Sequence, residues 1–293
     1  MRLAWYTTTF FWALFSSLAF GDPTVTKLRT EGVLLIVPVS INESGPYSFI
    51  LDTGSNRTLV RNDLLGALGI SPKRLAALSM PNGVIYARET VAKSVAVGGA
   101  SVNDLEVEGI DGSQIARMGV LIQGVLGEDF LKHFDVLIDN HAHTLTLDNA
   151  SDLADSLSGD HLPLSFSGRR GNDSTVDRLV VEVNLPLVKT LHFLIDSGTD
   201  SATFFPSKGA RYVPGVTHSE MVSTLRGNSL TRVGFVTVEL GKSTFANVPL
   251  VFSGDVSRDD YDVDGMLPTR IFNRLFISHS GGYAIANPRI RRS

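Results

Sequence analysis

Two short segments of the sequence end an apolar run with an aspartate. Residues 48–55 read SFILDTGS and residues 192–199 read HFLIDSGT, so the two aspartates are Asp52 and Asp196. Each carboxylate would lie where a predicted strand ends, and the glycine two residues later permits a tight turn or a close backbone approach. One copy is an ordinary turn sequence, but two copies in the same context indicate a paired site.

Paired carboxylates have a specific chemistry. If Asp52 and Asp196 lie close together, they cannot both ionise at low cost, so the pair holds one proton over a wide pH range. The ionised carboxylate can take a proton from a bound water, while the protonated one donates to a carbonyl oxygen of the substrate. The pattern therefore predicts hydrolysis of an amide bond without a metal and without a cysteine.

A longer repeat positions the two motifs. Residues 124–127 (GVLG) correspond to residues 265–268 (GMLP), and these segments end 75 residues after Asp52 and 72 residues after Asp196. Each is followed by a short helical turn that contains a phenylalanine, and then by a strand, a turn and a last strand. Agreement in both order and spacing predicts two related halves.

The body of the chain is patterned mostly as strands. Short β-branched or apolar runs bounded by turn residues occur at 33–37, 47–51, 91–97, 136–138, 144–147, 179–183, 192–195 and 234–240. Helices are expected only at 62–68 and 129–134. The sequence thus predicts a mainly β protein with an N-terminal lobe at 22–148, a polar linker at 149–160 and a C-terminal lobe at 161–293.

On these motifs the chain resembles the aspartic proteases of the retropepsin/pepsin clan, and it is most similar to the bacterial two-repeat, retropepsin-like aspartyl proteases. The resemblance covers nearly the whole chain beyond residue 21. It implies a bilobal, pepsin/retropepsin-like β fold with a central cleft between two pseudo-twofold-related lobes. It also implies that Asp52 and Asp196, one from each lobe, are the catalytic residues.

The resemblance assigns supporting roles to the residues around the two aspartates. It places Thr53 and Ser197 on hydroxyls that hydrogen-bond across the lobe interface. It places Ser55 and Thr199 on hydroxyls that bond the outer carboxylate oxygens, and residues 125–127 on the strand that packs behind the catalytic loop. The expected supporting residues are therefore Thr53, Gly54, Ser55, Ser197, Gly198 and Thr199.

The chain departs from the family pattern at two places. Pro268 stands where the strand behind the second catalytic loop is expected to carry a glycine. The flap hairpin is weakly marked, with Gly83 and Tyr86 as the candidates in the first lobe and residues 226–228 as their counterpart in the second. Tyr86 could face a substrate, although its β propensity favours an ordinary strand residue.

The first 21 residues have the pattern of a signal peptide. Arg2 precedes an apolar stretch at 3–20, which leads into Ala19-Phe20-Gly21, a small-x-small cleavage pattern. The stretch is short and polar for a membrane-spanning helix, so an uncleaved anchor is the alternative. We expect export to the bacterial periplasm or envelope, or out of the cell, with a membrane as partner only if the segment stays uncleaved.

Composition excludes several classes of function. The 293 residues include 26 Lys and Arg against 30 Asp and Glu, a formal charge of −4, whereas a nucleic-acid-binding protein normally carries a basic excess. The absence of cysteine excludes disulfides, zinc–thiolate sites, iron–sulfur clusters and Cys nucleophiles. There is no phosphate-binding glycine loop, so we expect no nucleic acid, no nucleotide and no cofactor.

Two sequence patterns resemble metal-binding motifs, but neither is complete. Residues 260–265 read DYDVDG, like the start of an EF-hand loop, but the twelfth position holds Ile271 in place of the required glutamate. His141 and His143 could lie on one side of a strand, but no third ligand accompanies them. We therefore expect no metal.

Together these features predict a monomeric, exported aspartic endopeptidase that acts on peptides or unfolded proteins. The first alternative is a non-catalytic module that keeps the same cleft for peptide binding, although the intact Ser55 and Thr199 favour catalysis. The second alternative is a retropepsin-style homodimer, which two motifs in a single chain make unnecessary.

Overall fold

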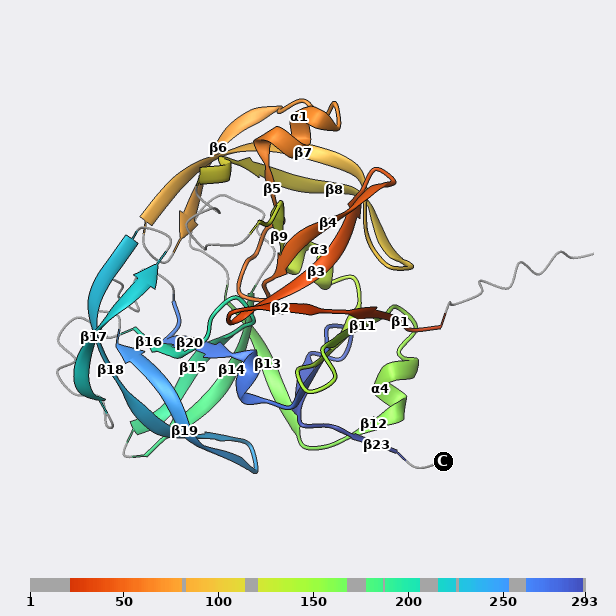
Figure 1. Ribbon diagram of the computed structural model, residues 1–293. Helices are drawn as coiled ribbons and strands as arrows, with labels where there is room; N and C mark the ends of the chain where they lie inside the picture. The colour runs from red at the N-terminus through yellow and green to blue at the C-terminus, as the bar shows by residue number, and fades with distance from the viewer. Residues whose placement is uncertain are drawn as a thin grey trace, which may run out of the picture.

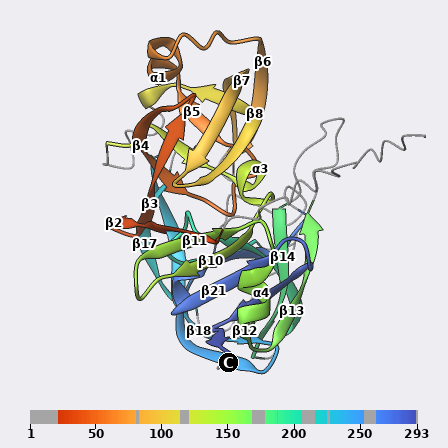
Figure 2. The same cartoon turned by 90° about the vertical axis from the view of Figure 1, so that its right-hand side faces the viewer.

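β-strands make up most of the computed structural model, which describes residues 22–80, 83–113, 121–167, 178–186, 188–205, 216–224, 227–252 and 262–291. The strands build two lobes, with the N-terminal lobe above the C-terminal lobe in Figure 1 and in the side view of Figure 2. The predicted mainly β, bilobal fold is thereby confirmed.

An eight-stranded sheet forms the N-terminal lobe, in the order β2-β3-β4-β9-β5-β8-β7-β6. Its strands are β2 (Arg29–Glu31), β3 (Leu34–Ile41), β4 (Ser44–Leu51), β5 (Leu59–Arg61), β6 (Arg74–Met80), β7 (Gly83–Val97), β8 (Ala100–Ile110) and β9 (Gly124–Leu126). Side chains alternate between the two faces of a strand, and Val37, Val39 and Ile41 of β3 are fully buried in the core.

Two short helices accompany this sheet. The helix expected at 62–68 is confirmed as α1 (Asn62–Ala67), directly after β5. The helix expected at 129–134 is α3 (Glu128–Leu131), which begins one residue earlier and ends sooner because residues 132–134 form a turn.

A thirteen-stranded sheet runs through the C-terminal lobe and the lobe interface, in the order β1-β11-β10-β21-β22-β13-β14-β15-β20-β16-β19-β18-β17. Its strands are β1 (Thr24–Lys27), β10 (Asp135–Asp139), β11 (Thr144–Asp148), β13 (His161–Ser167), β14 (Arg178–Leu185), β15 (Val188–Asp196), β16 (Ala202–Phe204), β17 (Val216–Thr224), β18 (Gly227–Leu240), β19 (Ser243–Phe252), β20 (Gly265–Pro268), β21 (Arg274–Ser278) and β22 (Tyr283–Ala286). A 3₁₀ turn, η1 (Thr269–Ile271), follows β20.

The lobes join through the middle of this sheet. β10 of the first lobe pairs antiparallel with β21 of the second, and β11 and β22 flank them as equivalent neighbours. The outer strands are β1 and β13, each the first strand of its half. This arrangement gives the interface an approximate twofold symmetry, and it confirms that the sequence repeat is a structural one.

The expected linker at 149–160 is more ordered than its polar composition indicates. It contains α4 (Asp152–Ser156) and β12 (Leu157–Ser158), and β12 pairs with β23 (Arg289–Ile290) near the end of the chain. In the part of the chain that the structure describes, no helix is long and apolar enough to cross a membrane. The predicted signal peptide lies outside the described residues.

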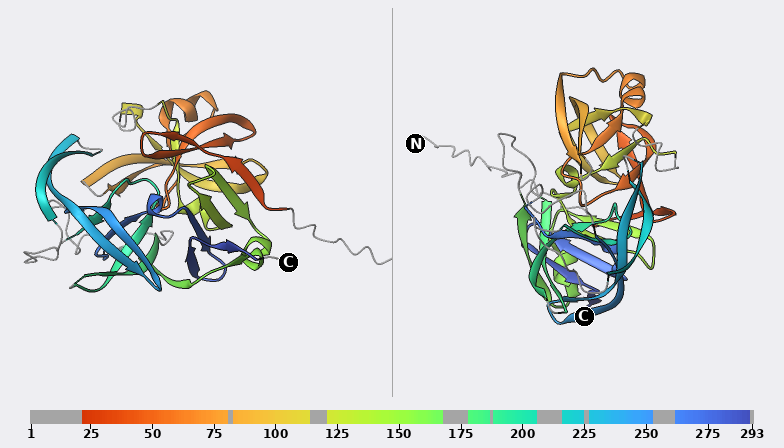
Figure 3. Two further views of the ribbon diagram at one scale, coloured as in Figure 1. Left: turned by 60° about the horizontal axis from the view of Figure 1, so that its bottom comes forward. Right: turned by 90° about the vertical axis from the view of Figure 1, so that its left-hand side faces the viewer.

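Two long hairpins extend from the lobes. β6 and β7 form one in the N-terminal lobe, and β17 and β18 form the other in the C-terminal lobe. Both lie on the left of the molecule in Figure 1 and in the left panel of Figure 3. These are the hairpins that the flap candidates predicted, although residues 81–82 and 225–226, between the paired strands, lie outside the described residues.

Candidate active site

The two aspartates lie at the ends of equivalent strands, at the interface between the lobes. β4 ends one residue before Asp52 and pairs in parallel with β9, while β15 ends at Asp196 and pairs in parallel with β20. Glycine is required at the start of both supporting strands. A Cβ on Gly124 would lie 2.3 Å from the Phe49 ring, and a Cβ on Gly265 would lie 2.6 Å from the Phe193 ring. Each buried phenylalanine therefore fits only opposite a glycine, which fixes how its strand pairs with the supporting strand.

The hydroxyls between Asp and Gly lock the two loops together. Thr53 N–H donates to Ser197 Oγ at 3.0 Å, and Ser197 N–H donates to Thr53 Oγ1 at 3.1 Å. Each hydroxyl then donates across the interface to a strand carbonyl, Thr53 to Ile195 O at 2.9 Å and Ser197 to Leu51 O at 2.8 Å. Both side chains are buried, and the structure therefore has the cross-lobe arrangement expected of them.

Removing these hydroxyls should weaken lobe docking. Thr53→Val and Ser197→Ala are each expected to lower the free energy of unfolding by about 1–3 kcal/mol, because buried backbone groups lose their partners. Thermal unfolding measures the effect, and Thr53→Ser, which keeps the hydroxyl, is the control. Unchanged melting temperatures for both variants would contradict the role of these hydrogen bonds.

The Asp52 and Asp196 loops approach as closely as glycine allows. A Cβ on Gly54 would lie 2.6 Å from Asp196 Cγ, and a Cβ on Gly198 would lie 2.8 Å from Asp52 Cγ. Each carboxyl group is thus packed against the opposite loop, and the two carboxyl groups hydrogen-bond each other. A hydrogen bond between two carboxyl groups requires a proton on one of them, so the geometry is that of a proton-sharing pair.

The surroundings of the two carboxyl groups differ. Asp52 Oδ1 accepts hydrogen bonds from the N–H groups of Gly54 at 2.9 Å and Ser55 at 3.0 Å. Asp196 Oδ1 accepts the Gly198 N–H at 2.7 Å. Burial raises the pKa of both, and the nearby Asp52 charge raises the pKa of Asp196 well above its ordinary value. Since backbone donors favour the ionised form, the two N–H groups at Asp52, against one at Asp196, favour placing the negative charge on Asp52.

One expectation for the loop hydroxyls is wrong. Ser55 Oγ donates to Arg57 O at 2.8 Å, and Thr199 Oγ1 donates to Ser201 O at 3.2 Å, rather than to the carboxylates. A hydroxyl has a single proton to donate, so these side chains close their own loops instead. The backbone N–H of Ser55, not its hydroxyl, reaches Asp52.

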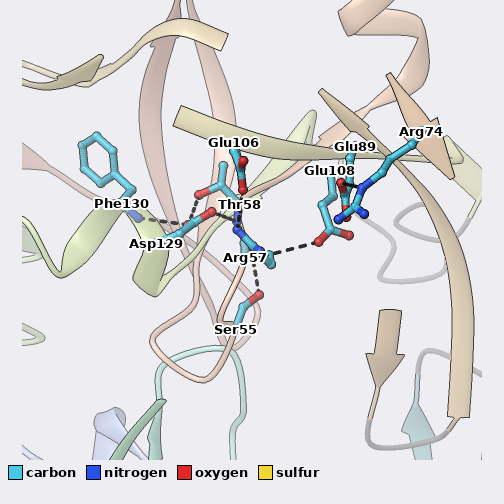
Figure 4. A network of polar contacts seen from close by, with 9 residues as sticks. All are labelled: Ser55, Arg57, Thr58, Arg74, Glu89, Glu106, Glu108, Asp129 and Phe130. Carbon is cyan, nitrogen blue, oxygen red and sulfur yellow. Dashed lines mark hydrogen bonds and ion pairs between the residues drawn. The ribbon is translucent and has the colours of Figure 1, made fainter. Parts of the chain in front are cut away.

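A polar network that the sequence did not reveal supports the first loop from behind (Figure 4). Thr58 donates to the Asp129 carboxylate through its N–H at 2.8 Å and its hydroxyl at 2.6 Å, and the Thr58 hydroxyl accepts the Gly127 N–H at 3.2 Å. Burial raises the pKa of Asp129 to about 6, against the effect of these hydrogen bonds. In the sequence, Asp129 was marked only by its position two residues after Gly127.

A comparison of the two lobes explains why a proline can stand at position 268. In the first lobe, Gly127 donates its N–H to Thr58, six residues after Asp52. Six residues after Asp196 stands Ala202, which has no hydroxyl, and Pro268 has no N–H to satisfy. Both members of the contact are therefore missing together. Pro268 still pairs in register with Asp196 on β15, so the departure leaves the aspartate in place.

Arg57 forms the outer part of this network, also visible in Figure 4. Its guanidinium group lies 3.4 Å from Glu106 and 3.7 Å from Glu108 of β8. Arg57 is mostly buried, whereas Glu106 is exposed at its side chain. These contacts tie the end of the Asp52 loop to β8, the strand that follows the β6–β7 hairpin.

The other predicted residues belong to different elements. Gly83 begins β7, and Tyr86 lies on the same strand with an exposed side chain. His143, in the turn between β10 and β11, contacts Thr30 of β2. Among the described residues, no three His, Asp or Glu side chains gather as metal ligands. Asp264 of the acidic segment accepts the His192 N–H at 2.9 Å, and residues 260–261 lie outside the described part.

Comparison with known families agrees with this geometry. Residues 37–130, from β3 to α3, match the family described as Aspartyl protease. The matched segment covers 94 of the 293 residues. It contains the Asp52 loop, the β6–β7 hairpin and the β9 strand, and the match confirms the predicted resemblance to the retropepsin-like clan. A comparison with curated proteins found no match.

Proposed function

We propose that the protein is an aspartic endopeptidase in which Asp52 and Asp196 together activate one water. The aspartyl protease family of its N-terminal lobe supports a peptidase hydrolase in general. The observation that carries the finer proposal is the pair of hydrogen-bonded carboxyl groups, one from each lobe, behind which Thr53 and Ser197 join the loops.

In this mechanism the two aspartates have different starting roles. Asp52, ionised and supported by two backbone N–H groups, accepts a proton from the water that attacks the peptide carbonyl carbon. Asp196 donates its proton to the carbonyl oxygen, giving a neutral tetrahedral intermediate. Proton transfer to the leaving nitrogen and collapse of the intermediate then break the C–N bond and return the pair to its starting proton count. The β6–β7 and β17–β18 hairpins are proposed to cover the bound peptide.

The alternative of a non-catalytic peptide-binding module predicts a different outcome in one assay. The purified chain should hydrolyse an unfolded protein at acidic pH, and a statine-type transition-state mimic should stop it. Peptide binding without hydrolysis at any pH would favour the binding module. A monomeric elution volume for the active protein would remove the homodimer alternative.

We further propose that the chain is exported, on the strength of the signal-peptide pattern in residues 1–21. Protein recovered from an export-competent host is expected to begin at or near Asp22, just before β1. N-terminal sequencing or intact-mass analysis checks this. A full-length chain that stays with the membrane would contradict cleavage and favour a membrane anchor.

A further inference from the structure

A buried ion pair joins the two lobes behind the Asp52 loop. Glu128 is the first residue of α3 in the N-terminal lobe, and His279 lies in the turn between β21 and β22. Their side chains are 1% and 8% exposed, and His279 Nε2 lies 2.9 Å from Glu128 Oε2. The other ring nitrogen, His279 Nδ1, lies 2.6 Å from the carbonyl oxygen of Phe134.

These two contacts fix the number of protons that the pair holds. The Phe134 carbonyl oxygen can only accept, so His279 Nδ1 carries a hydrogen. The hydrogen bond between Nε2 and the Glu128 carboxyl group then needs one more proton, on either atom. Losing that proton would place a carboxylate against a nitrogen lone pair, and Glu128 Oε1 has no hydrogen-bond partner among the described residues to offset the cost.

The surroundings of His279 favour keeping this proton. Asp135 of β10 accepts hydrogen bonds from the hydroxyls of Ser278 and Ser280, on either side of His279. Burial disfavours the imidazolium, but the hydrogen bond and charge of Glu128 outweigh burial and raise the pKa of His279, with a smaller contribution from Asp135. His279 also lines a cavity. The other charged or titratable side chains of this cavity are Lys132, His133, Asp135 and Asp148.

The pair also reaches the catalytic loop. Glu128 N–H donates to Ser55 O at 2.8 Å, and Ser55 N–H donates to Asp52 Oδ1 at 3.0 Å. The charge of Glu128 contributes to raising the pKa of Asp52. A change at this pair would therefore act on Asp52 both through the backbone and through the electric field.

We propose that His279 and Glu128 are a positioning pair for the catalytic aspartates, which holds one proton, fixes the Asp52 loop to the C-terminal lobe and sets the pH range of hydrolysis. This rests on the proposed peptidase function. Neither residue touches the substrate in this role. Their effect is on the proton affinity of the aspartate pair and on lobe docking.

Two variants should shift the pH profile in opposite directions. Glu128→Gln removes a negative charge near Asp52, so the alkaline limb of kcat/KM should move to lower pH by about 0.5 unit. His279→Gln leaves Glu128 without its cationic partner, so the limb should move to higher pH. Asp139→Asn, which breaks the cross-lobe ion pair between Asp139 and Arg274 (2.9 Å), is the matched control and should not move the limb. Shifts in the same direction, or none, would overturn the proposal.

A second measurement does not depend on hydrolysis. Because the pKa of His279 is raised on folding, its stabilisation is complete below the unfolded value of about 6.5 and is lost as pH rises through the folded value. The melting temperature of the wild type should therefore decline above pH 6.5, and that of Glu128→Gln should decline less. If His279→Gln does not fold, the double variant, with an amide at both positions, should fold and show the flatter profile.

The outcomes separate this proposal from the function on which it rests. No hydrolysis by any of the proteins would contradict the peptidase function, while the melting profiles would still decide the proton-holding role of the pair. Hydrolysis with parallel melting profiles in wild type and Glu128→Gln would overturn the pair alone.

Discussion

Replacing Asp52 or Asp196 with asparagine is expected to lower kcat/KM for a peptide substrate by about 10³-fold or more. Asparagine is nearly isosteric, so the loops should keep their packing, but it can neither take the water's proton nor alternate between acid and base. The double variant should be scarcely worse than either single variant, because groups that act as one unit lose their effects non-additively. Kinetics with one peptide substrate, with folding checked by circular dichroism, measure this.

The Thr53→Ser variant is a suitable active control, since it keeps the hydroxyl that bridges the lobes. Substantial activity in either single asparagine variant would contradict the two-aspartate mechanism. So would strictly additive losses, which would mean that the two side chains act separately.

Alanine at either catalytic-loop glycine should be almost as damaging. A new Cβ at Gly54 would lie 2.6 Å from Asp196 Cγ, and one at Gly198 would lie 2.8 Å from Asp52 Cγ. No carbon atoms pack at such distances, so a carboxyl group or a loop must move. We expect a loss of about 100-fold or more in kcat/KM, since small displacements of a catalytic group cost that much, and a destabilisation of about 1–3 kcal/mol.

Gly66 provides the matched control within the same lobe. It lies in α1, and a Cβ there would meet no atom within 4 Å. Gly66→Ala should therefore keep full activity, with stability unchanged or raised by about 0.5–1 kcal/mol through the better helix propensity of alanine. If Gly54→Ala and Gly198→Ala behaved like Gly66→Ala in the peptide assay, the close packing of the carboxyl groups would be contradicted.

The paired motif predicted the fold and the centre of the site because its information is local and repeated. A strand that ends in Asp, a hydroxyl residue and Gly predicts one tight turn. The second copy of the motif, at Asp196, predicts a second turn that lies opposite the first. The exchange of hydrogen bonds between Thr53 and Ser197 could be predicted for the same reason, since it needs only the two loops in register.

Contacts between residues far apart in the sequence could not be predicted in this way. Asp129 and Thr58 are 71 residues apart, and Glu128 and His279 are 151 residues apart. Each pair forms only because the strands behind the loops bring it together, and no motif marks either partner. The Ser55 hydroxyl shows a related limit: a transferred role assigned it to the carboxylate, but the local loop offers the nearer Arg57 carbonyl.

The pH dependence of hydrolysis follows from the shared proton. The pKa values of both aspartates are raised, and that of Asp196 is raised well above its ordinary value. Hydrolysis should be strongest while the pair holds one proton. It should fall as the pH rises through the upper pKa, because the acid that protonates the carbonyl oxygen is then missing.

Titration of the two carboxyl groups by NMR, with ¹³C-labelled aspartate, tests the shared proton most directly. Resonances can be assigned by their loss in Asp52→Asn and Asp196→Asn. We predict two coupled steps, the upper one well above the ordinary aspartate pKa, and an Asp196 carboxyl group that stays protonated while Asp52 is ionised. Two independent titrations near the ordinary value would contradict a proton-sharing pair, and with it the proposed mechanism.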